Sequence, residues 1–173
     1  MHLHHGRPSF VRASLPTHHS KGTACATLLW QLMRVSCSWL TSSVDGGGGD
    51  DEDAVLRWAV ERVGRVGGGA GAAAAPKAPL SLRDPALATS HFLLHLLYAL
   101  DPRIVNWAMV APLPCVSRAD CTANAQYALS VARRYGASVF LIHEDVSEVN
   151  ARMLSVLLAC IVHRAATVEQ EGR

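Results

Sequence analysis

Histidine and cysteine side chains at helical spacing are the residues in this sequence that most resemble a chemical site. His91 and His95 lie four positions apart, and two imidazoles at that spacing on one helix can hold a metal ion. Cys160 and His163 lie three apart near the end of another helical segment. A third ligand would have to come from elsewhere, from His143 or Cys160, and nothing in the local sequence supplies it. We therefore interpret both pairs as partly buried helix residues and predict no bound metal.

Carboxylates cluster in two places, at Asp50–Asp53 and at Glu144, Asp145 and Glu148. Paired carboxylates can carry out acid–base catalysis, but acids at the start of a helix also cap free amides and favour the helix dipole. We prefer the capping interpretation for both clusters. The sequence has no phosphate-binding loop, no G-x-S-x-G and no H-E-x-x-H motif. We therefore predict that the protein is not an enzyme and uses no cofactor.

The composition and net charge indicate the class of protein and exclude some kinds of partner. The chain has 173 residues, of which 50% are hydrophobic and 17% are charged, which is typical of a globular protein. Its net charge of +2 is too small to indicate nucleic acid. The longest apolar run, Met153 to Val162, is about half of the roughly 20 residues that span a bilayer, so we predict no membrane helix. Five scattered cysteines without C-x-x-C favour free thiols in a reducing compartment.

The first 49 residues differ from the rest. Residues 1–44 carry a charge of +4, whereas residues 45–173 carry −2. We predict a disordered leader over 1–23, a helix within 24–44 and a glycine linker at 45–49. Arginine and serine without acids in 1–44 are also a feature of transit peptides, which is an alternative to a structural role.

The remaining chain predicts an all-α fold. Its apolar periodicity indicates a compact helical domain over residues 50–165, followed by a tail at 166–173. We expect helices over 50–64, about 89–100, about 102–110, 117–135 and 150–164, with 137–142 as an extended connector. The segment after Ser90 is apolar nearly all round and should be the central buried helix.

Local signals predict where these helices begin and end. Gly64 and Gly136 should stop two of them, Gly136 in the left-handed conformation. Asp84 is followed by a proline at the first helical position. Ser117 and Asp120 have the spacing of a capping box, and Asn150 should cap the last helix.

The order of several short motifs resembles a calponin-homology domain, and most closely the last such domain of the fimbrin (plastin) family. The motifs are WAVERV at 58–63, the segment LSLRDPALATSHFLLHLLYALDP, and NAQYALSVARRYGASVFLIHEDVSEVNARMLSVLLACI. The stretch from Leu29 to Arg34 is similar to the closing helix of the preceding domain in that family. His143 stands where the family usually has proline. The resemblance implies a calponin-homology-like helical bundle, and we expect this chain to be a fragment of a longer protein.

The resemblance also implies a function, which is binding of filamentous actin in the cytoplasmic actin cytoskeleton. In this family two neighbouring calponin-homology domains form one actin-binding unit. Its surface would fall at Thr27–Leu40 and Asp51–Val63, with Gln31, Arg34, Arg57 and Arg62 as the solvent-facing candidates. Since this chain holds at most half of such a unit, we expect weak affinity in isolation. The alternative is a scaffold that binds another protein, such as tubulin or a signalling partner, without actin affinity.

Overall fold

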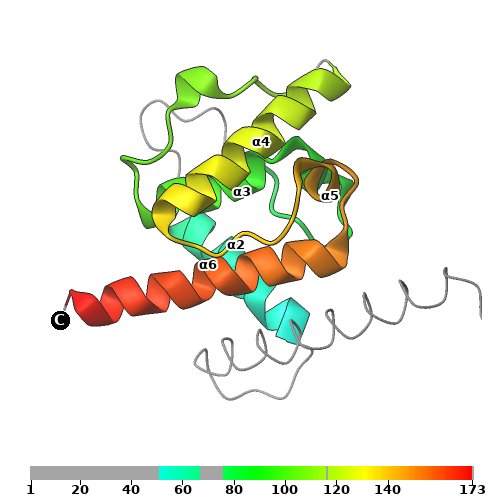
Figure 1. Ribbon diagram of the computed structural model, residues 1–173. Coiled ribbons are helices and arrows are strands. Elements are labelled where there is room, and N and C mark those ends of the chain that lie inside the picture. The colour runs from blue at the N-terminus through cyan, green and yellow to red at the C-terminus, as the bar shows by residue number, and fades with distance from the viewer. Residues whose placement is uncertain (1–50, 67–75, 116, 173) are drawn as a thin grey trace, which may run out of the picture. The chain divides into compact units, whose positions relative to one another are not determined.

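A computed structural model of the chain describes residues 51–66, 76–115 and 117–172 (Figure 1). Within these residues all regular structure is helical, which confirms the predicted all-α class. The elements in chain order are α2 (Asp51–Val66), η1 (Pro85–Thr89), α3 (His91–Leu100), η2 (Trp107–Met109), α4 (Arg118–Tyr135), α5 (His143–Ser147) and α6 (Ala151–Glu171), where η denotes a 3-10 helix. The leader predicted at 1–23, the helix predicted within 24–44 and the linker at 45–49 lie outside the described residues.

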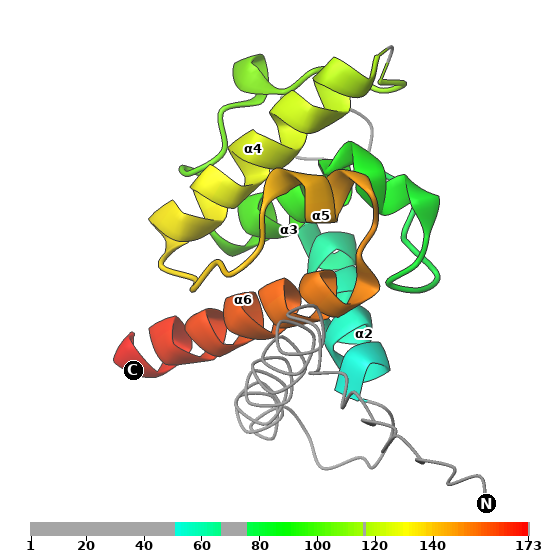
Figure 2. The same ribbon diagram turned by 45° about the vertical axis from the view of Figure 1, so that its right-hand side comes forward.

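Helix α3 is the centre of the fold. Every residue from His91 to Leu97 is buried, as the nearly uniform apolar sequence predicts. Helices α2 and α4 both pack against it, and α6 packs in turn against α2 (Figures 1 and 2). The short helix α5 contacts both α4 and α6, and η1 covers part of α3 and α4. The described helices therefore share one apolar core.

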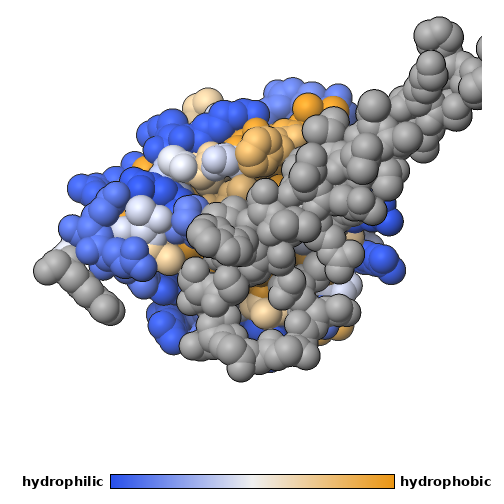
Figure 3. All heavy atoms as spheres, turned by 60° about the horizontal axis from the view of Figure 1, so that its bottom comes forward, coloured by the Kyte–Doolittle hydropathy of each residue, from blue (hydrophilic) through white to orange (hydrophobic). Residues whose placement is uncertain are grey.

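Helix α6 supplies much of that core. Nine of its residues are buried, among them Leu154, Leu157 and Ile161. By length and composition alone it is the one helix in the described part of the chain that could cross a membrane. Toward its C-terminal end α6 has a polar outer side, with exposed His163 and Glu169, and Figure 3 shows both hydrophilic and hydrophobic side chains on the face of the domain that carries this helix. This arrangement is that of a core helix in a globular domain.

Helix α4 has the ends that the sequence predicts. Ser117 Oγ accepts a hydrogen bond from the Asp120 amide at 3.1 Å, and the Asp120 carboxylate accepts one from the Ser117 amide at 3.0 Å. At the other end Gly136 has φ 94°, in the left-handed region. A Cβ at this position would lie 2.9 Å from Arg164 Nε. Glycine is therefore favoured at 136 by the left-handed conformation, and a side chain there would also displace that of Arg164.

Three predictions about the helices and their ends are wrong in part, each for a local reason. Helix α2 passes through Gly64, since an exposed helical glycine costs only about 1 kcal/mol relative to alanine. The helix expected over 102–110 is reduced to η2, because the side chains of Asp101 and Asn106 each accept from a backbone amide two residues ahead and hold separate turns. Asn150 stands at the N-cap position of α6, but its side chain donates to the Asp145 carboxylate at 2.8 Å instead of capping the helix.

Helix α6 also continues through Glu171, and so includes most of the range predicted as a tail. The extended connector is confirmed, because residues 137–142 form no helix or strand. In this connector Leu141 is buried between exposed Phe140 and Ile142.

The loop that joins η2 to α4 is held by a buried asparagine. Asn124 is fully buried, and its Oδ1 accepts from the Ala111 amide at 2.8 Å while its Nδ2 donates to the Ala111 carbonyl at 3.1 Å. His91 Nε2 donates to the same carbonyl at 2.8 Å. Ala111 lies in a loop, so its amide and carbonyl have no partner in a helix or sheet. The Asn124 side chain on α4 supplies a partner for both.

Replacement of this asparagine should destabilise the domain strongly. Asn124→Ala leaves the Ala111 amide without its partner and the Ala111 carbonyl with His91 alone, and it empties a fully buried position, so we expect a loss of about 3 kcal/mol in the free energy of unfolding. The matched control is Gln126→Ala, an exposed amide two positions along the same helix, which should change stability by less than about 0.5 kcal/mol. Urea unfolding followed by circular dichroism measures both, and equal effects would contradict the role given to Asn124.

Candidate functional site

The outer side of α2 carries a regular stripe of alternating charge. Val55, Leu56 and Ala59 are buried and fix the opposite side of the helix against the core. The stripe consists of exposed residues at i, i+4 spacing: Asp53, Arg57, Glu61 and Arg65. Within the stripe Arg65 pairs with Glu61 at 2.5 Å. The predicted surface residues Arg57 and Arg62 both lie on α2, but they have different surroundings.

Arg57 is the more available of the two arginines. Its side chain is exposed, and its Nε donates to the Asp53 carbonyl, four residues earlier, at 3.3 Å. Among the side chains that the structure describes, no carboxylate forms an ion pair with Arg57. Its terminal guanidinium nitrogens can therefore meet a carboxylate from outside the chain, in the paired geometry that arginine favours.

Arg62 is engaged within the domain. Its Nη2 lies 2.5 Å from Glu169 Oε1 near the end of α6, and its guanidinium lies 5.3 Å from the ring centroid of Trp58. Its side chain is 30% exposed. Arg62 thus ties α2 to α6, which sequence reasoning missed. The four-residue spacing of Trp58 and Arg62 could have indicated the stacking, but nothing local indicated Glu169, which is 107 positions away.

The other two predicted surface residues, Gln31 and Arg34, lie outside the described residues. The surface over Thr27–Leu40 to which they would belong stays a prediction for the same reason. The described part of the candidate surface is therefore the outer side of α2.

The two histidines of α3 are buried helix residues, as we interpreted them. His91 is fully buried and His95 is 7% exposed, with its ring 4.5 Å from that of Trp107, centroid to centroid. Burial lowers the pKa of His91, although its contact with the Ala111 carbonyl opposes this. Burial also lowers the pKa of His95, and the neighbouring His91 adds to the effect. Both imidazoles are therefore held in the neutral form. The described residues contain no cluster of three metal-ligating side chains.

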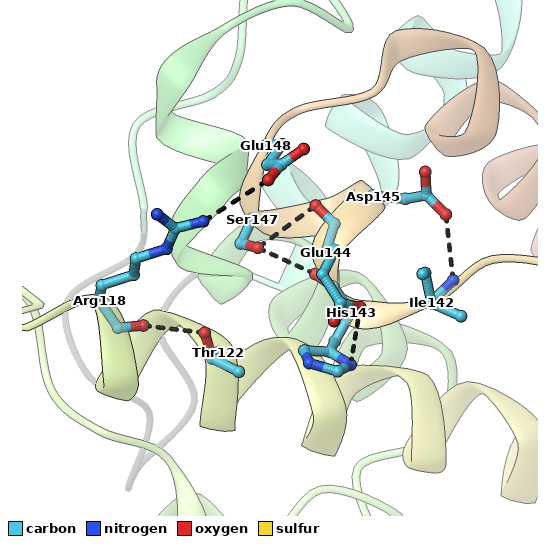
Figure 4. Close-up of polar contacts among 8 residues, drawn as sticks. All are labelled: Arg118, Thr122, Ile142, His143, Glu144, Asp145, Ser147 and Glu148. Atoms are coloured by element: carbon cyan, nitrogen blue, oxygen red, sulfur yellow. Dashed lines mark hydrogen bonds and ion pairs between the residues drawn. The ribbon is translucent and has the colours of Figure 1, made fainter.

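The acids before α6 hold backbone and neighbouring side chains in place, as Figure 4 shows. The Asp145 carboxylate accepts from the Ile142 amide at 3.1 Å, which caps the start of α5. Glu144 lies 3.1 Å from His143 Nδ1, and Glu148 lies 3.5 Å from Arg118 on α4. The capping interpretation is confirmed for Asp145, and the other two carboxylates form surface pairs.

Comparison with known proteins identifies the kind of domain. The model of the calponin homology (CH) domain family matches residues 50–167. Fimbrin-5 of Arabidopsis thaliana is 39% identical over 138 residues, which are 78% of this chain and 19% of that protein. Fimbrin of Saccharomyces cerevisiae is 34% identical over 136 residues, which are 78% of this chain and 20% of that protein. Plastin-3 of Bos taurus is 30% identical over 142 residues, which are 82% of this chain and 21% of that protein.

A solved structure agrees with the fold. The actin-crosslinking core of Schizosaccharomyces pombe fimbrin superimposes with a TM-score of 0.63 and 24% sequence identity, over 79% of this chain and 26% of that one. The resemblance to fimbrin and plastin CH domains is therefore confirmed, and this non-enzymatic family agrees with the prediction that the chain is not an enzyme. The chain spans about a fifth of the length of the curated relatives it matches.

The contacts of Arg62 predict a modest role in stability. Arg62→Ala should lower the free energy of unfolding by about 1 kcal/mol, because the stacking on Trp58 and the ion pair are both lost. Arg57→Ala, on the same helix, should change it by less than about 0.5 kcal/mol. In a double-mutant cycle with Glu169→Ala, the coupling should be only about 0.5 kcal/mol, since this pair is half exposed. Equal effects of the two arginine variants would show that Arg62 does not tie the helices together.

The buried histidines predict loss of stability in mild acid. Their pKa values are lowered in the folded state, so the unfolded chain takes up more protons below about pH 6.5. Stability should therefore be complete above pH 6.5 and fall as the pH drops below it. Urea unfolding at pH 7.5 and pH 5.5 measures this difference. His95→Leu should reduce it, whereas His163→Gln, at an exposed position, should leave it unchanged. A difference that His95→Leu does not reduce would argue against a role for His95.

Proposed function

This chain belongs to the calponin homology domain family, and we propose on that basis that it is an actin-filament-binding module of a fimbrin-like actin cross-linking or bundling protein. The observation that carries the proposal is homology to fimbrins and plastins over more than three quarters of the chain. The described surface adds support, because α2 presents an exposed arginine on its outer side. The partner is filamentous actin, and the location is the cytoplasmic actin cytoskeleton.

We also propose where the module belongs in such a protein. The chain would contain the last CH domain, over residues 50–165, together with the closing helix of the preceding one, within 24–44. The motifs NAQYALSVARRYG and Leu29–Arg34 support this assignment by their order. The relatives are about five times as long as the segment that matches this chain, which leaves room for several such domains. A neighbouring CH domain in the parent protein would then complete the actin-binding unit.

Arg57 is the described residue best placed to contact a filament. A guanidinium without a carboxylate partner among the described side chains can pair with an acidic group on actin at little desolvation cost. Arg62 would act indirectly, because it fixes the end of α2 through Glu169. Gln31 and Arg34 would extend the surface on the preceding helix. Contacts between exposed charges are individually weak and are screened by salt, so binding should require the neighbouring domain.

Co-sedimentation with filamentous actin tests this proposal. The chain alone should pellet weakly, and a longer chain that restores the preceding CH domain should pellet more strongly at low than at high salt. In the longer chain, Arg34→Glu with Arg57→Glu should weaken binding by about tenfold, which corresponds to about 1.4 kcal/mol. Arg133→Glu with Arg134→Glu makes the same change of charge at two exposed positions on α4 and should leave binding unchanged.

Two outcomes would count against the proposal. If the longer chain stays in the supernatant at low salt, the module does not bind actin. If the chain instead sediments with microtubules, the alternative of a CH scaffold for another protein is favoured. Retained binding in the double variant would leave actin binding intact but move its surface away from Arg34 and Arg57.

A further inference from the structure

Two cysteine thiols lie together where the loop after η2 enters α4. Cys115 stands in the loop, and its Sγ accepts a hydrogen bond from Asn124 Nδ2 at 3.7 Å. Cys121 lies three residues before Asn124 on α4, so it shares the side of the helix that faces Cys115. Cys121 is near enough to act on the Cys115 thiol, because after burial it is the neighbour that most raises the pKa of that thiol. Both side chains are partly exposed and carry no disulfide.

The two thiols differ in their surroundings. Burial, followed by the neighbouring Cys121, raises the pKa of Cys115 to about 11. Cys121 stands in the first turn of α4 and is partly exposed. Because the raised pKa keeps Cys115 in the thiol form, Cys121 is the first nucleophile and Cys115 reacts second.

We propose that Cys115 and Cys121 form a redox modification site, at which a low-molecular-weight disulfide such as oxidised glutathione converts the two thiols into an intrachain disulfide. The Cys121 thiolate attacks one sulfur of the small disulfide, whose S–S bond breaks and releases one small thiolate. The Cys115 sulfur then gives up its proton and attacks the Cys121 sulfur of the mixed disulfide. The second small thiolate leaves and is protonated. The two cysteines lose two electrons and two protons in total, and the small disulfide is reduced to two thiols.

The contacts around Cys115 confine the proposed disulfide formation to the loop and the start of α4. The loop that carries Cys115 is already fixed to α4, because Asn124 binds both backbone groups of Ala111. A bond between Cys115 and Cys121 would therefore join two segments that are already held together. Cys160, which is 5% exposed within α6, offers a small oxidant no comparable access.

The sequence supplies a direct assay. Arg118 lies between the two cysteines, so trypsin places them in separate peptides, 104–118 and 119–133. The full folded chain is equilibrated in glutathione buffers of increasing oxidised fraction, and remaining thiols are blocked with iodoacetamide. Tryptic peptides are then analysed by mass spectrometry without reduction. The expected product is the pair 104–118 and 119–133 joined together, about 2 Da lighter than the sum of the two peptides as free thiols.

Single variants separate the two roles. In Cys115→Ser, Cys121 should accumulate as a mixed disulfide with glutathione, because its partner is gone. In Cys121→Ser, Cys115 should remain a blockable thiol. Circular dichroism checks that both variants are folded, and Cys115→Ala and Cys121→Ala replace them if serine unfolds the chain. The proposal is overturned if both peptides remain alkylated in fully oxidised glutathione, if the wild type stops at a mixed disulfide, or if Cys115 pairs with Cys25 or Cys37.

Discussion

Helix α3 buries every residue from His91 to Leu97, so no side of its first two turns faces water. A helix of this kind has no solvent-exposed face, so other segments must pack against it on every side. Helices α2 and α4 cover part of it, and the segment from Asp101 to the start of α4 lies alongside, with Trp107 against His95. Because that segment contains only one short 3-10 helix, regular structure leaves most of its backbone amides and carbonyls without partners. The core can close only if side chains supply those partners.

Helix α4 provides two of these side chains. Asn124 binds both backbone groups of Ala111, and the Tyr127 hydroxyl accepts from the Asn106 amide at 2.7 Å. Their positions, three apart on α4, place them on the same side of that helix. The inner side of α4 therefore carries polar residues as well as apolar ones. The apolar residues pack in the core, and the polar residues bind the backbone of the loop. This explains how a domain with a wholly buried central helix tolerates a long irregular segment beside it.

What the sequence could predict was set by local interactions. The capping box of Ser117 and Asp120, the left-handed Gly136 and the buried segment after Ser90 all depend on residues within a turn or two of each other, and all three predictions hold. The prediction of a helix over 102–110 was wrong because the side chains of Asp101 and Asn106 each hold a short turn. Apolar periodicity does not show that such turns compete with a helix. The role of Asn124 was not predictable, because its partner is the backbone of a loop and carries no sequence signal.

The two arginines of the candidate surface show the same limit of prediction from local sequence. Arg57 and Arg62 are both arginines of α2 near its solvent side, and helical periodicity does not rank them. The difference comes from α6, which runs as far as Glu171 and so brings Glu169 within reach of Arg62. Had α6 ended near residue 165, as its apolar pattern suggests, Arg62 would have lost that carboxylate partner. The length of the last helix therefore decides which arginine of α2 remains available to a partner, and that length depends on polar residues beyond the apolar stripe.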